Sequence, residues 1–141
     1  DIRFAAESAK IAFLFPRVGL SGADMGAYWL LPRIVGLGNA SELLMTGDFI
    51  GAEEAHRIGL YNRVLPDGDA ARDEATELAE KLARGPSRAL EITKDSLNRE
   101  AHMDLEAALE SEAQIQAALM LNPNFREANE AFRENRDPEF E

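Results

Sequence analysis

One loop constrains this chain more than any other stretch of its sequence. Residues 15–26 run from Phe15-Pro16 into Arg-Val-Gly-Leu-Ser-Gly-Ala-Asp-Met-Gly, and a helical pattern follows. Small residues allow a backbone to approach a ligand closely. The loop places one acid, Asp24, at the predicted start of the helix, where unpaired N–H groups and the positive end of the helix dipole lie. The sequence therefore predicts a site with one carboxylate and no complete catalytic set.

The helix after this loop is predicted to run from about residue 25 to residue 34. Asp24 is its expected N-cap, because an aspartate at this position accepts hydrogen bonds from the first free N–H groups. Pro32 is expected to bend or end the helix, because proline lacks an N–H and clashes with the preceding turn. A second, short helical segment is expected at residues 41–45.

The chain changes character near Pro66. Residues 1–66 mix strand and helix patterns, whereas residues 67–141 have apolar residues at helical spacing. Two candidate strands at the start cannot form a self-sufficient sheet. We therefore expect residues 1–66 to be the end of a larger sheet domain, whose other strands lie upstream or belong to another chain. The expected strands or extended segments are 2–6, 11–15, 49–50 and 60–65, and the expected further helices are 51–59, 69–84, 87–98, 104–121 and 125–135.

The composition excludes several classes of protein. There is no cysteine, so disulfides and thiolate metal sites are absent, and the histidines and carboxylates lack a converging ligand spacing for any metal site. A formal net charge of −11 argues against nucleic acid or an anionic membrane as partner. No apolar run approaches membrane length and no leader pattern appears at Asp1. A cytoplasmic or organelle-matrix protein is therefore expected.

Five segments occur in an order that is typical of one family. They are residues 1–6, 15–20, 31–37, 42–50 and 52–64. They resemble the segments "CDIRIAAE", "FPEVGLG", "LPRLVGL", "ELLLTGRPI" and "AEEALRIGLVNRV" of the crotonase family, the enoyl-CoA hydratases and isomerases. The resemblance covers about the C-terminal half of a family member. It implies an α/β fold, in which residues 1–66 end a spiral of ββα turns and residues 67–141 form a helical region that assembles a homotrimer or hexamer.

The resemblance also implies an enzyme that acts on acyl-CoA thioesters in fatty-acid metabolism and uses no other cofactor. Such an enzyme stabilises a thioester enolate with two backbone N–H donors and moves protons with one or two carboxylates. In the family, the donors and the first glutamate lie before the position of Asp1, so the chain is expected to need the upstream half. The second family glutamate falls at Arg17, and a guanidinium cannot act as a general base near neutral pH.

Asp24 is the candidate that the resemblance offers in place of this glutamate. Residues 21–26, Ser-Gly-Ala-Asp-Met-Gly, resemble the "GLAADVGT" of dienoyl-CoA isomerase relatives more than the "GLIPGAGG" of hydratases. This implies that Asp24 reaches the acyl pocket as an acid or base. The alternative is a purely capping Asp24, which the helix dipole would hold ionised and make a weaker base.

Several of the remaining candidates have a structural alternative. Arg17 could form a loop-bracing ion pair, and Met25 and Trp29 could be core residues. Gly22, like Gly19 and Gly26, could serve only as a turn or helix-packing residue. The substrate-binding candidates are Arg17, Leu20, Ser21, Gly22, Met25 and Trp29.

The CoA-binding candidates are Phe132 and Arg136. They lie in residues 131–140, which resemble the family ending "AFLEKRKPRF", whose phenylalanine and lysine touch the CoA nucleotide. Phe132 could instead pack between helices. The family lysine falls at Asn135 here, so Arg136 or Arg133 would have to provide the positive charge.

Three functions stay open at this point. The first is a hydratase, which family frequency favours. The second is an enoyl- or dienoyl-CoA isomerase that uses Asp24, which the loss of the acid at Arg17 favours. The third is a catalytically weak CoA-binding or scaffold homologue.

Overall fold

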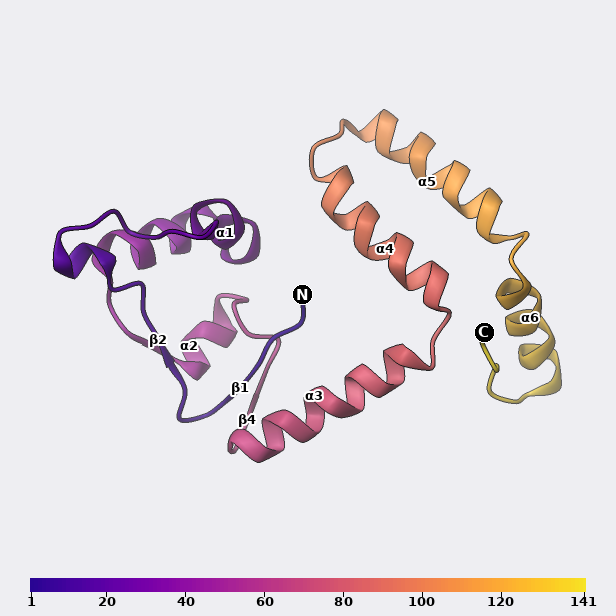
Figure 1. Ribbon diagram of the computed structural model, residues 1–141, viewed down its shortest axis with the longest axis horizontal. Coiled ribbons are helices and arrows are strands. Elements are labelled where there is room, and N and C mark those ends of the chain that lie inside the picture. Colours follow the sequence, from indigo (N-terminus) through magenta and orange to yellow (C-terminus); the bar gives the residue numbers. More distant parts are fainter. The chain divides into compact units, whose positions relative to one another are not determined.

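The computed structural model describes residues 1–141 and divides them into two compact units, Asp1–Thr76 and Glu77–Glu141 (Figure 1). Their boundary lies inside helix α3 (Gly68–Ala83), so it does not coincide with the change of sequence character at Pro66. No helix combines the length and the apolar character that crossing a membrane requires.

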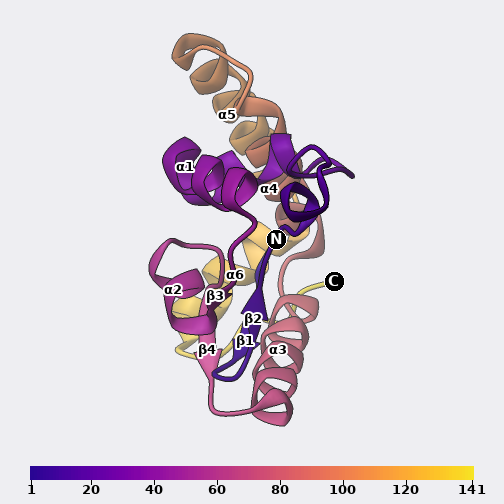
Figure 2. The ribbon, with the colours of Figure 1, turned by 90° about the vertical axis from the view of Figure 1, so that its left-hand side faces the viewer.

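The strands of the first unit are short and form two separate pairs. Strand β1 (Phe4–Ala6) pairs in parallel with β4 (Arg63–Leu65), and Figure 2 shows these two strands side by side. Strand β2 (Lys10–Ile11) pairs antiparallel with β3 (Ile50–Gly51). The prediction of four extended segments is thus confirmed in shortened form.

The predicted strand at 11–15 is wrong beyond Ile11. The 3₁₀ helix η1 (Phe15–Val18) occupies its end, with Pro16 in the first turn. Proline fixes φ near the helical value and needs no N–H partner there, so it starts a helical turn instead of merely stopping a strand.

Helix α1 (Ala27–Thr46) joins the two helical segments that the sequence predicts separately. The backbone stays helical through Pro32 and leaves the helical conformation at Gly36, where φ is 78° and ψ is 158°. Of the two expectations for Pro32, a bend or an end of the helix, the end is therefore wrong. Glycine tolerates positive φ at low cost, so Gly36 provides the break between the two segments. The compact helix α2 (Ala52–Arg57) follows as predicted.

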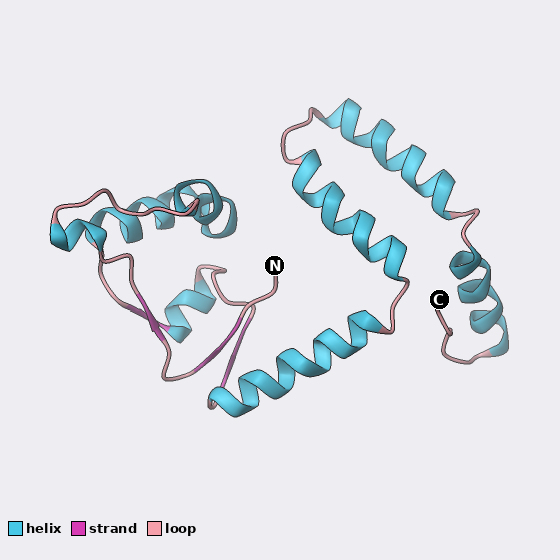
Figure 3. Ribbon diagram, in the orientation of Figure 1, coloured by secondary structure: helices cyan, strands magenta, loops and turns pink.

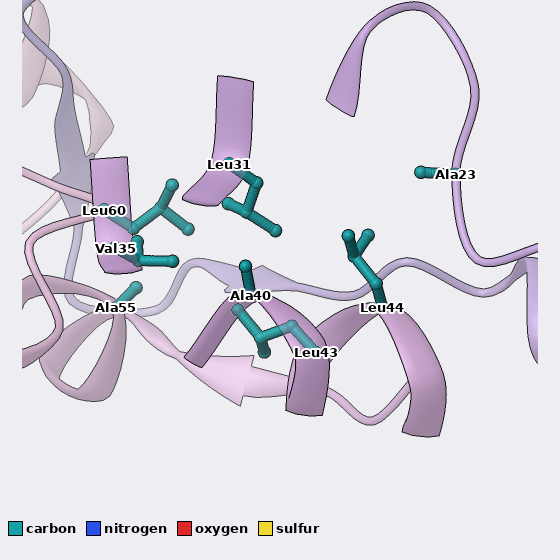
Figure 4. Packing of buried hydrophobic residues seen from close by; sticks show 8 residues of the cluster. All are labelled: Ala23, Leu31, Val35, Ala40, Leu43, Leu44, Ala55 and Leu60. Atoms are coloured by element: carbon teal, nitrogen blue, oxygen red, sulfur yellow. The ribbon is translucent and has the colours of Figure 1, made fainter. Parts of the chain in front are cut away.

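The core of the first unit is built mainly by α1. Leu31 and Val35 come from before the break at Gly36, and Leu43 and Leu44 come from after it. Ala55 of α2 and Ala23 of the loop before α1 complete the contact, and Figure 4 shows these side chains gathered with Ala40 and Leu60. Burying a leucine side chain contributes about 1.5–3 kcal/mol. The loop that carries Asp24 is therefore attached to the core through its neighbour Ala23.

The second unit is helical, as predicted (Figure 3). It contains the end of α3 and then α4 (Ser87–Glu100), α5 (Leu105–Leu119) and α6 (Pro123–Glu134). The Asp104 carboxylate caps α5 by accepting the Ala107 N–H at 2.9 Å, and the Asn122 side chain caps α6. Ala131 is the one buried residue of the second unit, so this unit has little core of its own.

Candidate functional site

The loop before α1 is packed closely against the second half of that helix. A Cβ built on Gly22 would lie 2.1 Å from the carbonyl oxygen of Leu44, so only glycine fits at this point. The loop leaves η1 at Gly19, whose φ is 75°, and the Leu20 N–H donates to the Phe15 carbonyl at 3.0 Å. The contact between Gly22 and α1 therefore holds the middle of the loop on the helix.

Tyr28, in the first turn of α1, reaches back to the same loop. The Ala23 N–H donates to the Tyr28 hydroxyl oxygen at 3.1 Å, and the Tyr28 hydroxyl forms a short hydrogen bond with Ser21 Oγ. The hydroxyl of the candidate Ser21 is thus engaged in a hydrogen bond within the chain. The sequence gives no signal for the role of Tyr28, because its partners depend on how the loop folds back.

Asp24 is exposed and does not cap α1. The helix begins at Ala27, its cap residue is Gly26 with φ 87°, and no side chain caps it. Met25 also has positive φ, at 49°. These two left-handed residues turn the chain between Asp24 and the helix, so the carboxylate cannot reach the first N–H groups. The predicted N-cap is therefore wrong, and the Asp24 carboxylate forms no hydrogen bond or ion pair.

Arg17 forms an ion pair with the segment that follows α1. One of its terminal nitrogens lies 2.6 Å from Asp48 Oδ1, and its guanidinium lies 5.8 Å from the centre of the Phe49 ring. This is the loop-bracing ion pair that the sequence left as an alternative. Because both partners are substantially exposed, the pair contributes only about 0–1 kcal/mol to stability.

A mostly apolar cavity of about 430 Å³ lies between the loop and α1. Leu20 and Gly22, two of the predicted substrate-binding residues, line it, and Tyr28, Leu37 and Met45 add further walls. Arg17, Ser21 and Asp24 do not line this cavity. Binding sites for small molecules are typically apolar with a few polar groups. The hydroxyls of Tyr28 and Ser41 provide such groups here, so the cavity can accommodate an apolar chain.

Met25 and Trp29 lie outside this cavity. Met25 is 94% exposed and Trp29 is 44% exposed, so the alternative of two core residues is wrong, and their role in substrate binding stays a prediction. The Arg33 guanidinium stacks on the Trp29 ring at 3.7 Å from its centre and donates to the Trp29 carbonyl at 2.7 Å. Trp29 and Arg33 thus form one surface unit on α1.

The two CoA-binding candidates have different surroundings. Phe132 is 87% exposed, so its alternative of packing between helices is wrong. Arg136, in contrast, pairs with Glu127 at 2.6 Å and with Glu134 at 2.7 Å. Hydrogen bonds from Arg136, together with one from the Glu139 N–H, lower the pKa of Glu127 to about 2. Bonds to Glu127 and Glu134 raise the pKa of Arg136. A phosphate would have to compete with both carboxylates for Arg136.

No group of three or more His, Asp or Glu side chains in the structure could hold a metal ion. The chemical groups at the loop are therefore one unpaired carboxylate, one engaged guanidinium and the two hydroxyls of Ser21 and Tyr28. Such a set can transfer a proton or orient a carbonyl compound, but it is not a nucleophilic triad.

The model of the enoyl-CoA hydratase/isomerase family matches residues 1–141, the whole chain. The chain belongs to the enoyl-CoA hydratase/isomerase family. The chain is 39% identical over 140 residues to a probable enoyl-CoA hydratase of Rhodobacter capsulatus, with 99% of the chain and 54% of the relative covered. It is 36% identical over 140 residues to the 1,2-epoxyphenylacetyl-CoA isomerase of Escherichia coli K12, with 99% and 53% covered.

The fold of this enoyl-CoA hydratase/isomerase family member agrees with that of solved relatives. A crystal structure of a provisionally named enoyl-CoA hydratase from Streptomyces coelicolor A3(2) superposes with a TM-score of 0.94 at 49% identity, over 100% of this chain and 51% of that one. The predicted fold class, the C-terminal part of a crotonase-like α/β fold, is confirmed. The chain spans about half the length of the relatives that it matches.

Proposed function

We propose that the whole protein is an enoyl-CoA hydratase/isomerase-type enzyme that acts on an acyl-CoA thioester in fatty-acid metabolism. The loop of residues 19–26 supports this proposal most, because the chain belongs to the enoyl-CoA hydratase/isomerase family. The loop lines an apolar cavity with Leu20 and Gly22, and it also carries the unpaired carboxylate of Asp24. The Asp24 carboxylate does not line the cavity itself, but Asp24 follows the lining residue Gly22 by two positions on the same loop.

In this proposal, Asp24 moves the proton at the carbon next to the thioester. A positioned acid or base typically accelerates such a step by about 10²- to 10⁴-fold. The enolate that develops needs two backbone N–H donors. In this proposal, the two donors come from a part of the whole protein that this chain does not include. The residues described here supply the carboxylate and the acyl pocket.

A second candidate, an enoyl- or dienoyl-CoA isomerase, is favoured by the ion pair between Arg17 and Asp48. Hydration requires a water molecule to be activated while a proton is delivered to carbon, which suits two carboxylates. Moving a double bond requires one group to take a proton from one carbon and return it to another. Among the residues of this chain, Arg17 stands where the family has its second acid and Asp24 is the one unpaired carboxylate of the loop, which fits the second task better.

The nucleotide end of CoA would lie against α6. Phe132 presents an almost fully exposed ring, and Arg133 next to it forms no hydrogen bond or ion pair. We assign phosphate binding to Arg133 and stacking on the adenine to Phe132. Arg136 then has a structural role, since Glu127 and Glu134 already bind it.

The helical unit is proposed to assemble a homotrimer or hexamer. Its apolar residues Leu97, Leu105 and Leu121 are 74%, 75% and 88% exposed. Exposed apolar surface of this kind typically marks an interaction site. Sedimentation of the whole protein at micromolar concentration checks this, and a monomer would contradict it.

An assay of the whole protein tests the proposed activity. Crotonyl-, 3-enoyl- and dienoyl-CoA are offered separately, and the thioester absorbance is followed. Turnover of crotonyl-CoA alone identifies a hydratase, and turnover of 3-enoyl- or dienoyl-CoA identifies an isomerase. Binding of CoA thioesters without turnover of any of the three would leave the scaffold alternative and contradict the proposal.

A further inference from the structure

We propose that Tyr28 is a positioning residue, whose hydroxyl fixes the loop that carries Asp24 and thereby sets the position of the Asp24 carboxylate. This inference rests on the proposed acid or base role of Asp24. Tyr28 itself is not assigned a contact with the reacting atoms.

The Tyr28 hydroxyl binds the two residues that flank Gly22 in the loop, Ser21 and Ala23. As an acceptor it receives the N–H of Ala23 at 3.1 Å, and its other hydrogen bond is the short one to Ser21 Oγ. A phenolic hydroxyl can accept and donate at the same time, so one oxygen serves both residues. Ala23 is 8% exposed, so its N–H would lose its partner at a buried position if the hydroxyl were removed.

No other hydrogen bond holds the backbone N–H groups of this part of the loop. Among residues 21–25, the N–H of Ala23 alone has a partner, and that partner is Tyr28. On the helix side, the Asp24 carbonyl accepts the Ala27 N–H at 3.0 Å. Asp24 therefore lies directly between two anchors, while its side chain has none of its own.

The conformation of the loop makes these anchors necessary. Met25 has φ 49° and Gly26 has φ 87°, and a non-glycine residue with positive φ persists only where its surroundings enforce it. Gly22 holds the other side by its close contact with Leu44. Without the Tyr28 hydroxyl, the segment between Gly22 and Ala27 would relax, and the Asp24 carboxylate would move with it.

The Tyr28 ring has a separate role that the test must keep constant. The ring lines the apolar cavity, so its removal would change substrate binding directly. Tyr28→Phe keeps the ring and deletes the hydroxyl alone. Since small displacements of a reacting group lower the rate strongly, we expect kcat to fall by about tenfold, while KM stays within about twofold.

A double-mutant cycle in the whole protein tests whether Tyr28 acts through Asp24. Turnover of the best acyl-CoA substrate is measured for wild type, Tyr28→Phe, Asp24→Asn and the double variant. We expect the loss caused by Tyr28→Phe to disappear in the Asp24→Asn background, because the group that it positions is gone. An equal loss in both backgrounds, or no loss in the wild-type background, would overturn the inference.

Two further measurements keep this test decisive. If Asp24→Asn alone leaves turnover unchanged, the proposed function of Asp24 has failed, and that result is distinct from a failure at Tyr28.

If Tyr28→Phe does not yield folded protein, Ser21→Ala takes its place, because it removes one of the two partners of the hydroxyl. A two- to threefold loss, roughly, that disappears in the Asp24→Asn background supports the inference. A loss that persists there, or no loss at all, contradicts it.

Discussion

Gly22 packs so closely on the backbone of Leu44 that a Cβ on Gly22 would lie 2.1 Å from the Leu44 carbonyl oxygen. This contact joins the loop before α1 to the far end of the same helix. The loop therefore depends on the break at Gly36, which allows the two halves of α1 to point in different directions.

We predict that Gly22→Ala destabilises the protein by about 1–3 kcal/mol, because the backbone of Leu44 cannot yield to a methyl group as a flexible side chain would. Denaturant unfolding measures this change. Gly38→Ala is the control, since Gly38 lies in α1, the helix that carries Leu44, and a Cβ there meets nothing within 4 Å. Equal effects of the two substitutions would contradict the account of the contact.

Arg17→Ala and Asp48→Ala separate the two roles considered for Arg17. If the ion pair only braces the loop, both variants lower stability by about 0–1 kcal/mol and have the same KM for the acyl-CoA substrate. If Arg17 also contacts CoA or the acyl group, Arg17→Ala alone raises KM. We predict the first outcome, and steady-state kinetics of the two variants decides between them.

At the CoA end, Phe132→Ala and Arg133→Ala are expected to raise KM with little change in kcat, because they contact a part of the substrate that does not react. Removing one stacked ring or one charged hydrogen bond should raise KM by about tenfold. The control is Arg126→Ala, which lies on the same helix and has only a 4.0 Å pair with Glu130. A rise in KM for the control as large as that for Arg133→Ala would contradict the assignment.

Glu127 makes stability depend on pH in a defined direction. Its pKa is about 2 in the folded protein, below the ordinary value of 4.5. A lowered carboxylate pKa stabilises the folded state above the unfolded pKa, and this stabilisation is lost as the pH falls. The difference in unfolding free energy between wild type and Glu127→Gln should therefore be constant near neutral pH and shrink as the pH falls from about 4.5 to about 2.

Urea unfolding at several pH values measures this difference. Glu130→Gln serves as control, because the Glu130 carboxylate is exposed and lies 4.0 Å from its partner Arg126. The difference for the control should change little over the same range. A difference for Glu127→Gln that stays constant down to about pH 2.5 would show that the Arg136–Glu127 contact does not stabilise the fold.

Local patterns were enough to predict the helices of residues 67–141. Apolar residues at helical spacing and capping side chains such as Asp104 act within a few residues of each other. The chemistry of the loop could be predicted only in part. That Gly36 and not Pro32 breaks α1, and that Asp24 lies outside the helix, depends on positive φ values at Gly36, Met25 and Gly26 that tertiary packing selects.

The contacts that were missed join residues far apart in the sequence or across a folded loop. Tyr28 binds Ser21 and Ala23 on the loop that folds back over it, and Gly22 of the same loop packs on Leu44. Arg136 meets Glu127 because the chain after α6 folds back, where the Glu139 N–H also donates to Glu127. The spacing rules for a single helix or strand do not predict these pairs. The residues could therefore be singled out from the sequence, but their partners could not.

Turnover by Asp24→Asn in the whole protein tests the central claim most directly. We predict that it falls by at least about tenfold on the enoyl- or dienoyl-CoA that the wild type converts, since losing an acid or base group typically costs about a hundredfold or more. Asp48→Asn, which changes an exposed carboxylate of the same unit, should keep turnover within about twofold, because an exposed ion pair contributes little. Unchanged turnover of Asp24→Asn would remove Asp24 from catalysis and contradict the account.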